Sequence, residues 1–178
     1  IKISLIELFS KNKKTIIIGS SWPKDEKILI RYIKSHPQNN YVIAPHELNN
    51  VSNLQKEINT LLYSHANKKN ILATNVLIID SIGLLSNIYK YGDLAYIGGG
   101  FGSGIHNILE AVAFGLPVIF GPNYKSFNEA ISLINKQGAI SISNYEELKS
   151  AINVFNNFDK SIALNYIEEN IGATKKIL

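Results

Sequence analysis

The sequence predicts an α/β fold with a Rossmann-like, doubly wound parallel sheet of about six strands. Short apolar runs, typical of buried strands, alternate with segments whose apolar residues recur every three or four positions, which is typical of helices. The stretch 94–122 also contains one complete unit of strand, glycine-rich turn, helix and strand. Because such crossovers are right-handed, repeated units of this kind build a doubly wound sheet. With 178 residues, the chain is expected to form a single domain over residues 1–178.

Residues 1–46 predict two strands with a helix between them. A short amphipathic lead over residues 1–13 precedes the first strand. Pro23, with Asp25 and Glu26 close behind it, is typical of the first turn of a helix. The three elements are expected at residues 15–18, 24–34 and 41–44.

Residues 47–97 predict two helices and two further strands. Leu54, Ile58 and Leu61 lie on one stripe of a helix that is expected over residues 51–65. The other elements are expected at residues 76–79 (strand), 84–89 (short helix) and 94–97 (strand).

The next stretch combines glycines with a helix start. Five glycines lie within seven positions directly after the strand 94–97. Glycine lets the backbone turn sharply and lets a ligand approach, while a following helix points unpaired N–H groups at the same place. With a helix starting near Gly104, Ile105, Ile108, Leu109, Val112 and Ala113 face the core, and His106, Asn107 and Glu110 face away from it. This polar trio predicts a site for an anion and for paired sugar hydroxyls.

The remaining residues complete the sheet. Asn144 is expected to cap a helix that runs to about Val154. The other elements are expected at residues 118–120 (strand), 127–136 (helix), 139–142 (strand) and 161–171 (helix, broken near Gly172).

Polar residues also follow the first two strands, at the edge where open α/β sheets bind ligands. Ser20 and Ser21 end the first strand, where they either cap the following helix or contact a ligand. Trp22 is expected to be a packing residue. His46 follows the second strand and would be a surface histidine by default.

Composition excludes several classes of function. The net charge of +4 comes from 17 lysines and the single Arg31, a poor composition for reading nucleic acid, so no nucleic acid partner is expected. The chain has no cysteine, and its four histidines lack metal-ligand spacing, so no metal is expected. The lysines predict a solvated surface with a modest attraction to anionic membranes. No apolar stretch approaches about 18 residues, and a start at Ile1 indicates an excised or processed fragment.

Three common nucleotide and hydrolase motifs are missing. The first strand is followed by GSSWP rather than GxGxxG, and the later glycines do not have that spacing. Gly99 and Gly104 have P-loop separation but precede Ile105 and His106 instead of lysine and serine or threonine. There is no GxSxG elbow. The pattern therefore predicts a nucleotide or nucleotide-sugar site of another kind.

Six short motifs follow one another from Gly19 to Pro122. They are Gly19-Ser20-Ser21-Trp22-Pro23-x-Asp25-Glu26, Pro45-His46, Asp80-Ser81-x-Gly83, Gly98-Gly99-Gly100, His106-Asn107-x-Leu109-Glu110 and Pro117-Val118-x-x-Gly121-Pro122. This ordered set resembles the carboxy-terminal domain of 3-deoxy-D-manno-octulosonic acid (Kdo) transferases. One departure is that Pro45 and His46 are adjacent, where many family members have an intervening arginine.

The resemblance implies one half of a GT-B glycosyltransferase of lipopolysaccharide biosynthesis. Such enzymes move Kdo from CMP-Kdo to a lipid A precursor, with inversion and without metal or cofactor. The acceptor and the catalytic carboxylate would belong to an amino-terminal domain absent here, so this chain would hold no catalytic residue and would be inactive alone. The parent protein would be peripheral, on the cytoplasmic face of the bacterial inner membrane.

The resemblance also implies a donor-binding role for residues in each of these loops. The glycine loop near the donor phosphate would be shaped by Gly100, Gly102 and Gly104. The cleft would be lined by Ser20, Ser21 and His46, with Ile82 and Gly83 beside the cytidine, and with Glu110, next to Asn107, on the ribose hydroxyls. His106 is expected among the donor-binding residues as well, where it can meet an anion. Two alternatives remain: another GT-B enzyme using a UDP-sugar, as transferase or epimerase, and a non-enzymatic nucleotide-binding module.

Overall fold

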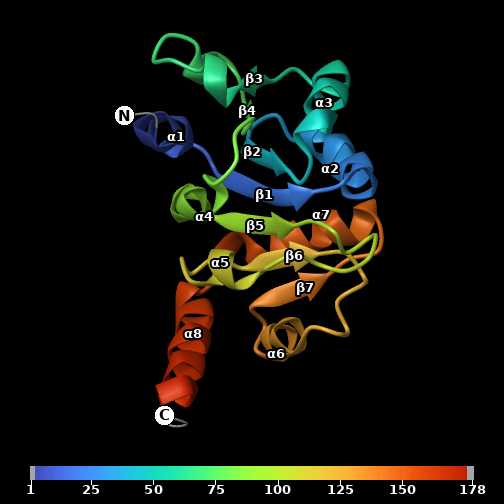
Figure 1. Ribbon diagram of the computed structural model, residues 1–178, viewed down its shortest axis with the longest axis vertical. Coiled ribbons are helices and arrows are strands. Elements are labelled where there is room, and N and C mark those ends of the chain that lie inside the picture. The colour runs from blue at the N-terminus through green and yellow to red at the C-terminus, as the bar shows by residue number, and fades with distance from the viewer. Residues whose placement is uncertain (1–2, 176–178) are drawn as a thin grey trace.

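The computed structural model describes residues 3–175 of the chain and contains one seven-stranded parallel sheet (Figure 1). The strand order is β3-β4-β2-β1-β5-β6-β7. In that order the strands are Leu61–Leu62, Val76–Ile78, Asn40–Pro45, Thr15–Ser21, Leu94–Ile97, Val118–Phe120 and Ala139–Ser141. The predicted doubly wound sheet and its six strands are confirmed, and β3 is an additional edge strand.

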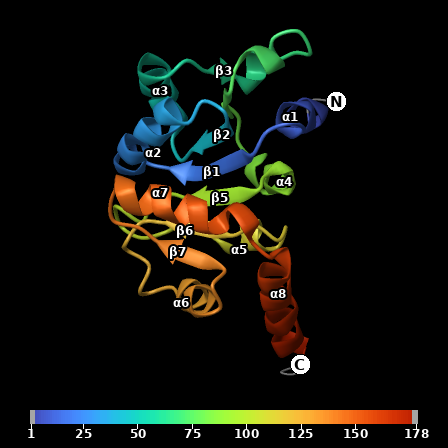
Figure 2. The same cartoon turned by 180° about the vertical axis from the view of Figure 1, so that it is seen from behind.

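Helices cover both faces of the sheet, as Figures 1 and 2 show from opposite sides. One face is covered by α2 (Pro23–Ser35), α3 (Val51–Glu57) and α7 (Tyr145–Val154). The other is covered by α1 (Ile3–Ser10), α4 (Leu85–Ile88), α5 (Leu109–Val112), α6 (Asn128–Asn135) and α8 (Lys160–Lys175). Strand side chains alternate between the two layers, so Ile17 packs into one core cluster and Ile16 and Ile18 into the other.

The helix predicted over residues 51–65 is wrong in its second half. The α3 helix ends at Glu57, and Ile58 is extended with φ −138° and ψ 147°. Leu61 and Leu62 then pair with Leu77 and Ile78 of β4. An unpaired edge would leave backbone groups of β4 without partners, and pairing satisfies them. Two of the apolar residues whose spacing suggested a helix are nevertheless buried: Leu54 lies within α3, and Ile58 directly follows its last residue.

Two other helix predictions need correction. The α5 helix begins at Leu109 and not near Gly104, so residues 104–108 are irregular. The final helix, α8, is not broken near Gly172 but continues to Lys175. One glycine costs a helix only about 1 kcal/mol, which a helix of this length tolerates. By contrast, Asn144 caps α7 as predicted, because its side-chain oxygen accepts a hydrogen bond from the Glu147 N–H at 2.9 Å.

Candidate functional site

The candidate site lies where the strand order changes direction. The chain winds from β1 through β2 and β4 toward one edge, and from β5 through β6 and β7 toward the other. The adjacent strands β1 and β5 therefore flank the topological switch point, outside whose carboxyl ends open α/β sheets bind their ligands. The loops after both strands form the site.

The glycine loop after β5 packs its backbone directly against neighbouring backbone. A Cβ atom on Gly98 would lie 2.1 Å from the carbonyl oxygen of Ser20, and one on Gly100 would lie 2.6 Å from the nitrogen of Gly121. Real Cβ contacts are never this short, so both positions require glycine. Gly100 thus joins the β5 loop to the β6 loop.

Gly102 differs from these two glycines because it faces open space. A Cβ atom there would meet only the Gly99 carbonyl oxygen, at 3.5 Å. Beside it lies a cavity of about 360 Å³, lined by Trp22, Pro23, Lys24, Gly99, Gly102 and Ser103. The cavity is therefore bounded by the start of α2 and by the glycine loop, at the switch point. Gly104, with φ +141°, closes the loop against the Phe127 ring.

Asp25 holds the two walls of this cavity together, which the sequence interpretation missed. Its carboxylate is fully buried and accepts three hydrogen bonds, from the Trp22 N–H (2.9 Å), the Tyr96 hydroxyl (2.8 Å) and the Gly99 N–H (3.0 Å). The first bond caps α2, the second reaches β5 and the third reaches the glycine loop. Burial, together with the Asp25 carboxylate, raises the pKa of Tyr96, so the phenol stays a hydrogen-bond donor.

Three aromatic rings stack next to the cavity, and one of them, Trp22, belongs to its lining. The rings of Trp22 and His46 lie 4.3 Å apart, and those of His46 and His106 lie 4.5 Å apart. The Trp22 indole N–H also donates to Nε2 of His106 at 2.9 Å. Burial, and then the neighbouring His46, lowers the pKa of His106, which favours the neutral ring that can accept this bond. Trp22 is therefore half-buried and part of the site, beyond the packing role predicted for it.

Ser20 and Ser21 do not cap α2, which was one of the two roles predicted for them. Ser21 is buried, and its hydroxyl donates to the Glu26 carboxylate at 2.9 Å. Ser20 has φ 52°, in the left-handed region, and coincides with an irregularity in the pairing of β1 with β2. That bulge re-aims the end of β1 next to the site. The cap comes instead from Asp25, as described above.

The polar trio lies at the end of the glycine loop. His106 and Asn107 precede α5 and are not in the first turn of a helix as predicted, whereas Glu110 lies in the first turn of α5. Asn107 and Glu110 are exposed, and the Asn107 amide donates to Oε1 of Glu110 at 3.1 Å. Burial and, secondly, the Glu110 carboxylate raise the pKa of Tyr89, whose hydroxyl lies over Gly19 near the end of β1. Glu110 thus lies near the switch point. Leu109 is 37% exposed, so the prediction that it faces the core is wrong.

Ile82 and Gly83 lie in the turn that follows β4, at the same edge of the sheet. Ile82 is 90% exposed, and Gly83 has φ +85° with open space around it. Asp80 anchors the turn, because its carboxylate accepts hydrogen bonds from the Ser64 N–H and hydroxyl. The turn therefore presents an apolar side chain on a fixed base.

Two kinds of feature are absent from residues 3–175, the part of the chain that the structure describes. No cluster of three or more histidine, cysteine, aspartate or glutamate residues with metal-binding geometry occurs among them. Of the helices in the same range, none combines the length and apolar character that crossing a bilayer requires.

The fold and the switch-point site define a Rossmann-like domain of the kind found in GT-B glycosyltransferases. In structure the chain is similar to the C-terminal CMP-Kdo binding domain of WaaA from Acinetobacter baumannii, with a TM-score of 0.74, 17% identity and coverage of 93% of this chain and 98% of that one. HepE from Anabaena, solved with UDP-glucose, matches with a TM-score of 0.63 and 18% identity over 99% of this chain and 53% of that one. At these identities both likenesses concern the fold.

In sequence the chain is similar to 3-deoxy-D-manno-octulosonic acid transferases. It is 28% identical to the enzyme of Rickettsia typhi over 178 residues, which are 95% of this chain and 38% of that protein. The Rickettsia bellii enzyme is 30% identical over 90% of this chain and 40% of its own length. The chain thus spans about two fifths of these curated relatives. No model of a known protein family matches it.

Proposed function

We propose that this chain is the nucleotide-sugar (donor) binding domain of a glycosyltransferase that moves Kdo from CMP-Kdo to a lipid A precursor in lipopolysaccharide biosynthesis. The observation that supports this best is the switch-point cavity, because Trp22, Pro23 and Gly99 in its lining belong to two of the motifs that resemble Kdo transferases. The sequence similarity to such enzymes over 95% of the chain supports the same reading.

The site offers distinct groups to the parts of the donor. Gly102 leaves the cavity open for a phosphate-linked group, and Gly100 and Gly104 keep the loop in shape. The Glu110 carboxylate, steadied by Asn107, accepts hydrogen bonds from the ribose hydroxyls. Ile82 and Gly83 offer an apolar surface to the cytosine, while His46 and His106 line the cleft beside Ser20. Ser21 supports this wall from inside the fold, where its hydroxyl donates to Glu26.

Catalysis would require a second domain. An inverting displacement needs a general base within hydrogen-bond reach of the acceptor hydroxyl. In this proposal that carboxylate and the lipid acceptor belong to an amino-terminal domain, so the 178-residue chain binds CMP-Kdo without transferring sugar. Turnover of CMP-Kdo by the purified chain would contradict this division of roles.

The parent protein would work as a peripheral protein on the cytoplasmic face of the bacterial inner membrane. The net charge of +4 supports attraction to anionic lipid, which contributes about 1 kcal/mol for each basic residue near the surface. Fractionation of the full-length protein tests this: release from membranes only at high salt is expected, and a freely soluble protein at low salt would contradict it.

The proposed donor is tested by comparing CMP with UMP in calorimetric titrations of the chain. Tighter binding of CMP is the expected result. Tighter binding of UMP would instead support a UDP-sugar enzyme. This is the alternative suggested by the similarity in fold to HepE, which was solved with UDP-glucose. Binding of neither nucleotide would contradict the proposal.

A further inference from the structure

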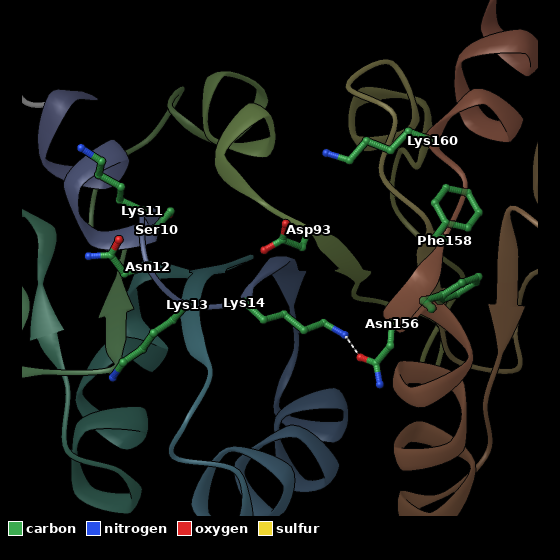
Figure 3. A pocket seen from close by; sticks show the side chains of 10 residues that line it. Ser10, Lys11, Asn12, Lys13, Lys14, Asp93, Asn156, Phe158 and Lys160 are labelled. Atoms are coloured by element: carbon green, nitrogen blue, oxygen red, sulfur yellow. Dashed lines mark hydrogen bonds between the residues drawn. The ribbon is translucent and has the colours of Figure 1, made fainter.

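A second cavity, of about 480 Å³, lies at the opposite edge of the sheet from the switch-point site. Its lining includes Lys14, which directly precedes β1, and Asp93, which directly precedes β5. Because both strands are parallel, these residues mark the amino-terminal edge. The end of α1 and the start of α8 complete the cavity (Figure 3).

Lysines dominate the charge of this cavity. Lys11, Lys13, Lys14 and Lys160 line it together with a single carboxylate, that of Asp93. Asp93 is already engaged, because its Oδ2 accepts a hydrogen bond from the Thr15 N–H at 2.8 Å. Within residues 3–175, the ion pairs found involve other cations, and none neutralises these four lysines. The cavity therefore has excess positive charge, contributed by the segment between α1 and β1 and by the first residue of α8.

Lys14 is held by hydrogen bonds in the lining of the cavity. It is half-buried, and its ammonium group donates to the Asn156 side-chain oxygen at 2.6 Å and to the Ile152 carbonyl at 3.4 Å. Figure 3 shows the hydrogen bond between Lys14 and Asn156. In that view Asp93 lies between the side chains of Lys14 and Lys160. Burial lowers the pKa of Lys14, while the nearby Asp93 opposes this effect. A fixed, partly desolvated cation is thus already in place before any ligand arrives.

Positive charges that line one hollow create a positive potential there, which attracts an anion. Lysine ammonium groups suit phosphate as point charges, and the side-chain amides of Asn12 and Asn156 add polar partners. Phe158 gives the same cavity an apolar wall. We propose that this cavity is a binding site for a phosphate-bearing anion, separate from the switch-point site.

Such an anion has two sources, a soluble phosphate compound or the headgroup of an anionic phospholipid. Inorganic pyrophosphate probes the first in calorimetric titration at about 0.15 M salt, where distant surface charges are screened. Vesicles of phosphatidylglycerol, compared with phosphatidylcholine, probe the second by co-sedimentation. Binding of either probe identifies the source.

The decisive comparison uses two double variants with the same net charge. Lys11→Gln/Lys160→Gln removes two cations of the cavity and leaves the structurally engaged Lys14 in place. Lys56→Gln/Lys149→Gln removes two exposed lysines that lie outside the cavity. We expect the first variant to bind the effective probe at least about tenfold more weakly and the second to change less than about twofold, since charged contacts at a defined site contribute this much.

Thermal melts of both variants are the control for a retained fold. The affinity of the first variant for CMP is expected to equal that of the unchanged chain. Equal weakening by the two double variants would overturn the proposal, because it would mean non-specific attraction to a basic surface. Absence of binding to both pyrophosphate and anionic vesicles would also overturn it. Neither result depends on whether the switch-point site binds CMP.

Discussion

The buried carboxylate of Asp25 accepts a hydrogen bond from the backbone N–H of Gly99, 74 positions away in the sequence, at 3.0 Å. This bond connects the start of α2 to the glycine loop. Since the same carboxylate also binds the Trp22 N–H and the Tyr96 hydroxyl, one side chain fixes the relative position of both cavity walls. We regard Asp25 as a positioning residue for the site.

Replacing Asp25 with asparagine should therefore destabilise the chain and loosen the glycine loop. An amide offers one acceptor oxygen in place of two, which leaves buried donors unsatisfied at a cost of about 1–3 kcal/mol. Chemical denaturation measures the loss, and hydrogen exchange should show faster exchange at the Gly99 amide. Glu168→Gln, at an exposed position, is the matched control. Equal stability of the Asp25 and Glu168 variants would contradict the positioning role.

His106 should make the stability of the chain depend on pH. Its pKa is lowered in the folded chain below its ordinary value of 6.5, chiefly by burial. The folded state therefore prefers the neutral ring, and this contribution is complete above the unfolded pKa and is lost as the pH falls through the folded pKa. Protonation at Nε2 would also remove the acceptor for the Trp22 indole.

Thermal melts at several pH values between about 7.5 and 5 measure this dependence for the chain, for His106→Gln and for the control His65→Gln. The chain and the control should lose stability on acidification, and His106→Gln should lose less. A steeper or equal acid dependence in His106→Gln would contradict the assignment.

Alanine substitutions at Gly100 and Gly102 should distinguish a glycine that the fold requires from one that leaves room for the ligand. Alanine at position 100 would place its Cβ 2.6 Å from the Gly121 nitrogen, so overpacking should cost about 1–3 kcal/mol. Alanine at position 102 meets only one atom, at 3.5 Å, so stability should stay within about 0.5 kcal/mol. The added methyl group would nevertheless narrow the cavity and weaken CMP binding. Unchanged CMP affinity in Gly102→Ala would place the ligand elsewhere.

Sequence reasoning was most reliable where local chemistry decides the structure. The β-branched run at Thr15 and the apolar run at Leu94 formed the predicted strands, and Asn144 formed the predicted cap, because each depends on neighbouring residues. The edge strand at Leu61 was missed because it is only two residues long and is defined by its pairing with β4, which the local apolar pattern does not show. The spacing of the apolar residues fits one long helix as well as a short helix followed by a strand. Only the free edge of β4 decides between these two structures.

The site was predicted at the correct edge of the sheet but with part of its machinery missing. The motif containing Asp25 was noted, yet an acidic residue in a first helical turn looks the same whether it is solvated or fully buried. Its partners, Tyr96 and Gly99, are brought close only by the pairing of β1 with β5. Likewise, the late start of α5 reflects the packing of residues 104–108, which helix propensity does not encode.

The role proposed for Glu110 is open to direct test because its side chain is exposed and makes its one hydrogen bond in the described structure with the exposed Asn107. Replacing it with alanine should leave the core intact, so a stability change within about 0.5 kcal/mol is expected. Glu168→Ala, on the exposed side of α8, serves as the matched control.

The most direct test of the proposed function is calorimetric titration of CMP into the chain and into Glu110→Ala, with thermal melts of both. A hydrogen bond to a charged group contributes roughly 1.5–3 kcal/mol, so the variant should bind CMP about 10- to 150-fold more weakly at an unchanged melting temperature. Unchanged affinity would contradict the ribose-binding role of Glu110. A collapse of the melting temperature would show instead that the carboxylate holds the loop and α5 in place.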